Sequence, residues 1–325
     1  MLGAGSWGTA LAIQFARGGR PVRLWGRDRG RLADMAVSRR NERYLASAQF
    51  PDSVRRERNA GLGTTMSTSR AVASAAFRSL LTELAPHLAP DLHIAWATKG
   101  FEHGSLKLPH QIACEVLGAE RRVAVLSGPT FAREVGAGLP TAMTVASPDA
   151  PYARALAHEL SSANFRAYTS TDIMGVEIGG AVKNALAVGA GLSDGLGFGA
   201  NTRVALITRG LKEMTRLGVA LGAQRDTFMG LAGLGDLVLT CTDDQSRNRR
   251  FGLLLAAGRT AQAALAEIGQ AVEGYAAAGA IHEVAARAGV EMPLCEMAYR
   301  VLYQHLPAKE AVRSLMSRPI KAEAE

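Results

Sequence analysis

Three closely spaced glycines, Gly3, Gly5 and Gly8, constrain this chain most, because they form a G-x-G-x-x-G turn before an apolar helical stretch that ends near Gly18. The first glycine of such a turn permits a tight bend, the second lets the backbone approach a pyrophosphate, and the third lets the helix pack closely on a strand. Alone the motif is weak. It gains weight because residues 21–28 follow as a strand, at the spacing expected in a dinucleotide-binding sheet.

The end of this strand bears on the choice of cofactor. Arg27 stands where NAD-specific proteins often carry an acid for the ribose hydroxyls. An arginine at this place suggests a bound 2′-phosphate and therefore NADPH. The alternative is an arginine that ends a strand in solvent.

Two features of the first half depart from a regular dinucleotide-binding domain. Only Met1 and Leu2 precede the glycine turn, so the expected first strand is truncated. Residues 55–74 are polar and patternless where another buried strand is due. Because two lost strands would remove more apolar burial than most domains can spare, we expect a chain that is poorly folded or weak in cofactor binding, with an intact second domain.

Beyond this segment, strands and helices alternate. We expect strands over 92–97, 123–127, 141–146 and 165–169, and helices over 77–88, 108–117 and 152–161. Lys99 follows the first of these strands, where open α/β sheets bind ligands. Gly128, Pro129 and Thr130 are expected to open a helix whose free N–H groups could hold an anion.

From Asp172 onward the pattern is helical almost throughout, which predicts an α/β domain over 1–170 and an all-α domain over 171–325. Lys183 lies amid small and apolar residues in a long helix predicted from about 172 to 191. A lysine so placed finds a partner or has its pKa lowered, and both prepare a proton donor. The alternative is a side chain that extends to solvent.

Three more segments of the second half have ligand-like patterns. Asp236 is a single acid among glycines and apolar residues. Residues 246–250 (SRNRR) open a helix, where guanidinium groups, an amide and helix N–H groups would form a phosphate cradle; a solvated basic helix start is the alternative. Residues 269–274 are either a ligand loop or a helix start with Glu273 in its first turn.

The composition narrows the classes of function. The net charge of +8 suits anionic partners, but few aromatic residues accompany the arginines, which disfavours nucleic acid and favours small phosphorylated ligands. No apolar run approaches the roughly 18–20 residues that span a bilayer, and no signal peptide is expected. The three cysteines are widely spaced and in no metal-ligand pattern, which fits a reduced cytosol and predicts no metal site.

Ten motifs occur in order through most of the chain: GAGSWGTALA, LWGRD, WATKG, SGPTFA, GGAVKN, AGLSDG, GFGANTR, GLAGLGDLVLTCT, SRNRRFG and VEGY. Together they closely resemble the bacterial NAD(P)-dependent sn-glycerol-3-phosphate dehydrogenases. The resemblance implies an N-terminal Rossmann domain, a helical substrate domain, and reduction of dihydroxyacetone phosphate by NADPH or NADH to glycerol 3-phosphate, the backbone precursor of phospholipids. We therefore expect a cytoplasmic enzyme without a nucleic-acid partner or stable membrane insertion, with a homodimer as the candidate assembly.

The resemblance also implies roles for individual residues. Lys183 matches the family's proton donor and acceptor, Lys99 a second lysine that contacts cofactor and substrate, and Asp236 an acid that orients Lys183 and binds a substrate hydroxyl. Further substrate positions are Gly128, Thr130, Ser246, Arg247 and Asn248. Further cofactor positions, besides Gly3, Gly5, Gly8 and Arg247, are Ser6, Trp7, Arg27, Ala132, Ala271 and Glu273.

Two alternatives remain at this point. One is another two-domain Rossmann reductase, such as a 3-hydroxyacid dehydrogenase, which would act on a carboxylate. The other is an inactive or cofactor-deficient remnant, which keeps its site residues but no longer seats a cofactor.

Overall fold

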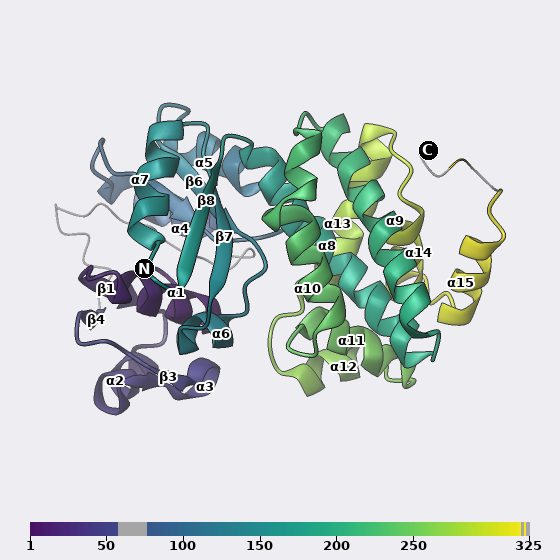
Figure 1. Ribbon diagram of the computed structural model, residues 1–325, viewed down its shortest axis with the longest axis horizontal. Coiled ribbons are helices and arrows are strands. Elements are labelled where there is room, and N and C mark those ends of the chain that lie inside the picture. Colours follow the sequence, from purple (N-terminus) through teal and green to yellow (C-terminus); the bar gives the residue numbers. More distant parts are fainter. Residues whose placement is uncertain (58–76, 320–321, 323–325) are drawn as a thin grey trace. The chain divides into compact units, whose positions relative to one another are not determined.

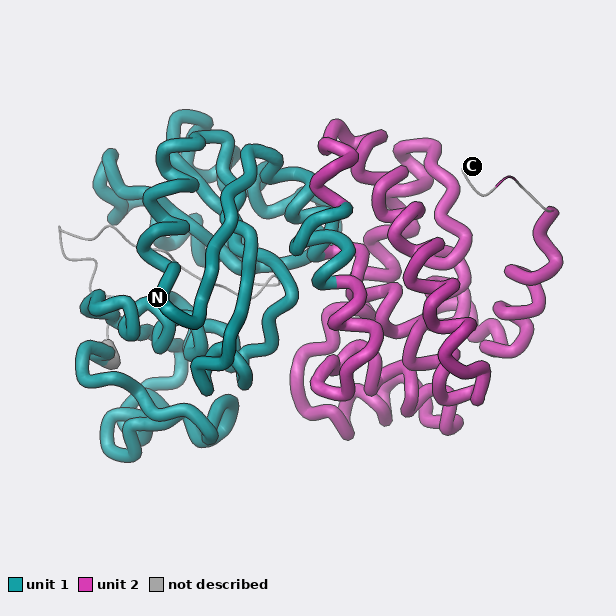
Figure 2. Tube along the Cα trace, viewed as in Figure 1, with its two compact units in different colours: residues 1–180, 229–236 teal, residues 181–228, 237–325 magenta. Residues whose placement is uncertain are grey.

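The computed structural model describes residues 1–57, 77–319 and 322, and the chain divides into two compact units (Figures 1 and 2). Unit 1 comprises residues 1–180 and 229–236, and unit 2 comprises residues 181–228 and 237–325. One long helix, α8 (Ile173–Gly195), begins in unit 1 and continues into unit 2.

Unit 1 combines strands and helices. Its strands are β1 (Val22–Trp25), β2 (Arg40–Asn41), β3 (Ala46–Gln49), β4 (Val54–Glu57), β5 (Ile94–Trp96), β6 (Val123–Ser127), β7 (Thr141–Ala146) and β8 (Phe165–Ser170). Its other helices are α1 (Ser6–Arg17), α2 (Arg29–Ser38), α3 (Glu42–Leu45), α4 (Phe77–Leu84), α5 (Pro109–Leu117), α6 (Ala132–Ala137) and α7 (Ala150–Leu160).

The largest sheet has the strand order β5-β6-β7-β8. Strands β5 and β6 are parallel, β6 and β7 are antiparallel, and β7 and β8 are parallel. Both faces are buried at β5, whereas side chains of the edge strand β8 reach solvent, among them Tyr168, which is 48% exposed. Ile94 and Trp96 of β5 pack with α4, α5 and the start of α8, whereas Ala95 and the following Ala97 pack with α1 and α7. The alternation of side chains along a strand therefore produces a sheet between two layers of helices.

The first residues of the chain pair with β1, although the sequence predicts a truncated first strand. The Gly3 N–H donates to the Trp25 carbonyl at 2.9 Å, the Trp25 N–H donates to the Met1 carbonyl at 2.9 Å, and Leu2 forms a parallel bridge to Trp25. Strand β1 also pairs in parallel with β4, as a separate two-stranded sheet. These few backbone hydrogen bonds attach residues 1–3 to β1.

The segment expected to be patternless overlaps β4. Residues 55–57 belong to this strand, in register with residues 23–25 of β1. That part of the expectation is wrong, because polar side chains do not prevent backbone pairing with a neighbouring strand. Residues 58–74 of the predicted anomaly lie outside the described residues.

Unit 2 is helical in every regular element that the structure describes. After α8 its helices are α9 (Gly199–Ala220), a 3₁₀ turn (Arg225–Met229), α10 (Asp236–Thr242), α11 (Arg247–Ala256), α12 (Ala261–Ile268), α13 (Glu273–Ala288), α14 (Pro293–Tyr303) and α15 (Ala308–Met316).

Helix α8 is a core helix. By length and composition alone it could cross a membrane, contrary to the expectation that no apolar stretch is long enough, but 89% of its most apolar window is buried inside the protein. It packs tightly on α11, where a Cβ added at Gly252 would lie 2.2 Å from the Val188 carbonyl oxygen. Only glycine allows the two backbones to approach so closely.

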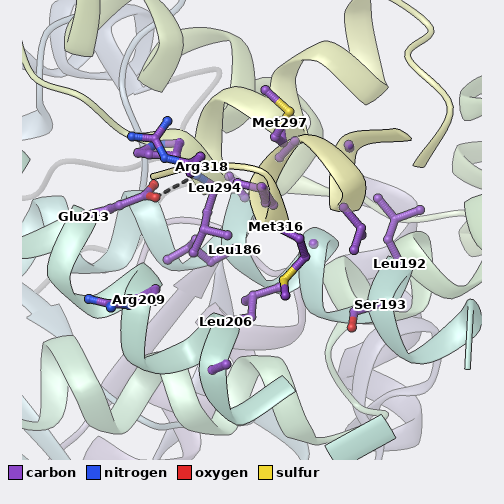
Figure 3. A pocket seen from close by; sticks show the side chains of 18 of the residues that line it. Leu186, Leu192, Ser193, Leu206, Arg209, Glu213, Leu294, Met297, Met316 and Arg318 are labelled. Atoms are coloured by element: carbon purple, nitrogen blue, oxygen red, sulfur yellow. Dashed lines mark hydrogen bonds between the residues drawn. The ribbon is translucent and has the colours of Figure 1, made fainter. Parts of the chain in front are cut away.

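A cavity of about 920 Å³ lies within unit 2, and Figure 3 shows its lining. Aliphatic and methionine side chains from α8, α9, α14 and α15 form most of its wall, among them Leu186, Leu206 and Met316. The carboxylate of Glu213 accepts hydrogen bonds from the backbone N–H groups of Leu294 at 2.6 Å and Cys295 at 3.1 Å.

Candidate active site

The glycine turn has the geometry that a dinucleotide phosphate requires. Gly3 has φ 109°, and a Cβ added at Gly8 would lie 1.8 Å from the Gly3 carbonyl oxygen, so both positions exclude other residues. A Cβ added at Gly5 would meet nothing within 4 Å, which leaves the backbone open to a ligand. Gly5 caps α1 without a side-chain hydrogen bond, so N–H groups of the first turn remain for an anion. These residues fit NADPH or NADH.

The neighbouring cofactor candidates follow from the same elements. Ser6 and Trp7 are half-buried in the first turn of α1, and Trp7 packs against the core. Arg27 is exposed two residues after the end of β1. Asp28, next to it, caps α2 by accepting from the Arg31 N–H at 3.1 Å. An exposed arginine fits either a 2′-phosphate ligand or the alternative of a solvated strand end.

The structure brings Lys99 and Asp236 together, although they are far apart in sequence. The Lys99 ammonium lies 2.7 Å from Asp236 Oδ2, and the two side chains are 16% and 2% exposed. Lys99 follows the carboxyl end of β5, while Asp236 follows a π-helical turn, Leu231–Gly235, and begins α10. An ion pair this deeply buried holds both groups in one geometry, because separating them would leave charges in an apolar surrounding.

The loop after β6 lies next to Gly235, the residue before Asp236. A Cβ added at Gly235 would lie 3.5 Å from Pro129 Cγ, and the Thr130 hydroxyl donates to the Gly128 carbonyl at 3.2 Å. Gly128 has φ 148°, a conformation that favours glycine. Helix α6 begins only at Ala132, so the prediction that residues 128–130 open the helix is wrong by a few residues. They belong to the loop that precedes the helix instead.

In unit 2 the side chain of Lys183 is buried and hydrogen-bonded. It is 7% exposed, and its ammonium donates to Thr240 Oγ1 at 2.9 Å. The alternative of a lysine that extends to solvent is therefore wrong. Sequence reasoning missed Thr240, since a threonine in an apolar helix gives no signal of the lysine that it meets.

A chain of amides links three helices next to Lys183. Asn184 Nδ2 donates to Glu273 Oε2 at 3.0 Å, and Asn248 Nδ2 donates to Asn184 Oδ1 at 2.8 Å. The Gly274 N–H donates to Asn248 Oδ1 at 2.8 Å. Helices α8, α11 and α13 are thus fixed to one another by donors and acceptors that satisfy each other. Asn184 was not among the predicted site residues, although it ends the GGAVKN motif.

The basic cluster at the start of α11 is only partly solvated. Ser246 caps the helix by accepting from the Arg249 N–H at 3.2 Å. Arg249 is 9% exposed and lies 2.7 Å from Asp194 Oδ2, so this arginine has a structural ion pair. Arg247 is half-buried and donates to Gln270 Oε1 at 3.3 Å. The cluster is therefore not a fully solvated helix start, although Arg250 is exposed, and the contact of Arg247 is longer than that of Arg249.

The segment 269–274 contains a helix start, which was one of its two predicted structures. Glu273 is the first residue of α13 and Ala271 is exposed two residues before it. The Glu273 carboxylate also accepts from Asn184, as described above.

A glycine turn suited to a pyrophosphate and buried lysines paired with an acid and a hydroxyl define a nucleotide-dependent oxidoreductase with a Rossmann-type unit and a helical unit. Comparisons with known proteins agree. Residues 1–153 match the N-terminal model and residues 172–313 the C-terminal model of NAD-dependent glycerol-3-phosphate dehydrogenase. The chain belongs to this family.

Individual relatives cover nearly the whole chain. It is 52% identical to glycerol-3-phosphate dehydrogenase [NAD(P)+] of Edwardsiella ictaluri, over 99% of this chain and 96% of the relative. It is 53% identical to the protein of that name from Aeromonas salmonicida, over 98% and 96%. The crystal structure of glycerol-3-phosphate dehydrogenase from Coxiella burnetii superposes with a TM-score of 0.93 at 44% identity, over 98% of each chain.

Proposed function

We propose that this protein reduces dihydroxyacetone phosphate to sn-glycerol 3-phosphate with NADPH or NADH, reversibly, and thereby supplies the backbone of glycerophospholipids. The observation that carries the proposal is Lys183, an ammonium that is 7% exposed and fixed to Thr240 beside the amide chain of Asn184. Family membership and the fit of the glycine turn to a dinucleotide support the choice of cofactor.

Reduction of the ketone requires transfer of a hydride to its carbon and of a proton to its oxygen. NADPH or NADH, when bound at the glycine turn, would supply the hydride that the carbonyl carbon accepts. Lys183 gives a proton to the carbonyl oxygen, so the ketone becomes an alcohol, and a preorganised ammonium also stabilises negative charge that develops on that oxygen. Asp236 orients the site and binds a substrate hydroxyl, and Lys99 contacts both cofactor and substrate.

The remaining site residues contact either the substrate or the cofactor. Ser246, Arg247 and Asn248 form the phosphate cradle, Gly128 and Thr130 are positions of the substrate loop, and Arg247 also faces the cofactor. Ser6, Trp7, Arg27, Ala132, Ala271 and Glu273 contact the cofactor, with residues 1–170 as its domain and residues 171–325 as the substrate domain. The enzyme acts in the cytoplasm without nucleic acid or stable membrane insertion, and a homodimer is its candidate assembly.

The test is oxidation of NADPH that depends on dihydroxyacetone phosphate. Lys183→Met keeps an unbranched apolar stem but removes the ammonium, so kcat should fall about 10²–10⁴-fold, the range that a positioned acid contributes. Lys309→Ala, at an exposed position on α15, is the matched control and should retain the wild-type rate. Turnover of a non-phosphorylated 3-hydroxyacid in preference to glycerol 3-phosphate would contradict the proposal, as would full activity of Lys183→Met.

A further inference from the structure

A carboxylate without an assigned role lies deep in unit 1. Glu177, on the first turns of α8, has a side chain that is 1% exposed. Its Oε1 accepts from the Trp96 indole N–H at 2.8 Å and from the His110 backbone N–H at 3.1 Å. Its Oε2 lies 2.5 Å from His110 Nδ1.

Burial of the Glu177 carboxylate would destabilise the fold if the side chain only filled space. Transfer of a carboxylate into the interior is unfavourable, and burial raises the pKa of Glu177, while its contacts with His110 and Trp96 oppose that rise. Apolar residues in place of the whole buried pair, Glu177 together with His110, would often be equally stable or more stable. A buried carboxylate with several aligned donors instead specifies one position for the elements that carry them.

The donors belong to elements that lead to the candidate site. Trp96 is the last residue of β5, and Lys99 follows it after two residues. His110 lies in the first turn of α5. The Trp96 ring also contacts Phe77 edge to face, with ring centroids 5.3 Å apart, so its indole N–H has a fixed direction.

The next residues of α8 contact Lys99 and the turn that precedes Asp236. A Cβ added at Gly180 would lie 3.3 Å from both Cγ and Cδ of Lys99, so the helix supports the stem of that lysine. A Cβ added at Gly179 would lie 2.4 Å from the Ala232 carbonyl oxygen, in the π-helical turn before Asp236. A shift of α8 along β5 would therefore disturb both partners of the ion pair.

We propose that Glu177 is a positioning residue, whose hydrogen bonds to Trp96 and His110 hold α8 against β5 so that Lys99 and Asp236 keep their paired geometry. Glu177 does not touch the reacting atoms. Its effect on turnover rests on the proposed roles of Lys99 and Asp236, whereas its effect on the ion pair does not.

The first measurement is kinetic. Glu177→Gln keeps an acceptor for the indole N–H but removes the charge, and Glu177→Leu removes every acceptor. Because displacement by about 1 Å in an active site can cost about 100-fold, we expect kcat/KM for dihydroxyacetone phosphate to fall about 10-fold in the Gln variant and about 100-fold in the Leu variant. Trp96→Phe, which removes the indole donor and therefore one of the hydrogen bonds to Glu177, should also lower kcat/KM about 10-fold.

The matched control is Glu213→Gln in unit 2. Glu213 is also a buried carboxyl, 4% exposed, that accepts two backbone N–H groups, but it lies on the cavity wall and has no proposed role in catalysis. Its replacement by an amide should leave kcat/KM near the wild-type value. A general effect of replacing a buried carboxyl would lower activity in both proteins.

The second measurement follows Lys99 directly. Limited acetylation of the ligand-free proteins, read by mass spectrometry, gives the rate at Lys99 relative to the exposed Lys309. Loosening of the ion pair should raise this ratio about threefold in Glu177→Gln and about tenfold in Glu177→Leu, with no change in Glu213→Gln. If Leu prevents folding, the Gln variant and Trp96→Phe still decide the question.

An unchanged Lys99 ratio in folded Glu177→Gln and Trp96→Phe would overturn the positioning role, whatever their turnover. Absence of dihydroxyacetone phosphate reduction in the wild type and in Glu213→Gln would overturn the proposed function instead. Failure of the positioning role is thus read from Lys99 acetylation in the variants, whereas failure of the proposed function is read from turnover of the wild type.

Discussion

The Lys99–Asp236 ion pair is the residue-scale feature on which the proposed chemistry of unit 1 depends. Its partners are 137 positions apart, yet the ammonium and the carboxylate lie 2.7 Å from each other. Removal of one partner of a buried pair leaves the other charge uncompensated, whereas removal of both costs less. The pair therefore makes a prediction about stability that is independent of turnover.

Lys99→Met should lower the free energy of unfolding by about 3 kcal/mol, and Lys99→Met combined with Asp236→Asn should lower it by less. Denaturant titration of the single and double variants measures this difference. Additive losses would mean that the two side chains do not stabilise each other in solution. All of these variants should have severely reduced turnover, so stability and activity report on separate properties of the same pair.

At this scale the motifs of the sequence indicate Lys99, Lys183 and Asp236, because each is a charged residue among glycines or apolar residues. They do not indicate which side chains these residues contact. Thr240 as the partner of Lys183, and Glu177 as the partner of Trp96, are identified only by the structure, since the choice of a hydrogen-bond partner depends on distances between elements. The roles of the predicted site residues stay predictions until the variants are measured.

At the scale of elements, the close contact of α8 with α11 depends on glycine. A Cβ at Gly252 would meet the Val188 carbonyl oxygen at 2.2 Å and the Leu192 nitrogen at 2.7 Å, both backbone atoms that cannot rotate away. Gly189, also within α8, would meet only Leu206 Cδ1, at 3.6 Å. Two helical glycines of the same unit thus differ in their surroundings, which provides a matched pair for substitution.

Gly252→Ala should destabilise the protein by about 1–3 kcal/mol or more, because α11 must move away from α8. Gly189→Ala should instead be neutral or stabilising by up to about 1 kcal/mol, since alanine has the higher helix propensity. Thermal unfolding followed by circular dichroism would show opposite shifts in Tm. Equal shifts would mean that the backbones are not in contact as the structure has them.

Periodicity predicted individual elements better than their boundaries and pairing. The strands expected at 123–127 and 141–146 are confirmed as β6 and β7, because each is a short apolar run between turn residues. Their antiparallel pairing is not visible in either run, since pairing depends on how distant segments meet. Similarly, the polar residues 55–57 gave no strand pattern, and backbone pairing with β1 decides their structure.

At the scale of the whole molecule, the change from alternating strands and helices to helices alone was visible in the sequence. β8 ends at Ser170, and every later regular element among the described residues is helical. The cavity of unit 2 was not visible, because its wall combines residues of four helices with no motif in common. Its buried Glu213 nevertheless has a measurable consequence for the stability of the protein.

Burial raises the pKa of Glu213 to about 7 from its ordinary 4.5, while hydrogen bonds from the Leu294 and Cys295 N–H groups and the charge of Arg216 act in the opposite direction. Between pH 4.5 and about pH 7 the Glu213 carboxyl keeps its proton in the folded chain, whereas it has lost that proton in the unfolded chain. Raising the pH through this window therefore favours unfolding, and the contribution of Glu213 falls by about 3 kcal/mol in all before it becomes constant above pH 7.

Glu213→Gln has no proton to release, so it isolates this effect from the other titrating groups. The free energy of unfolding of the wild type minus that of Glu213→Gln should decrease steadily from pH 5 to about pH 7 and then stay level to pH 8. The loss of one acceptor for the two backbone N–H groups adds an offset that does not depend on pH. Denaturant titrations at each pH measure the difference, and parallel curves for the two proteins would contradict a Glu213 carboxyl that is protonated in the folded chain.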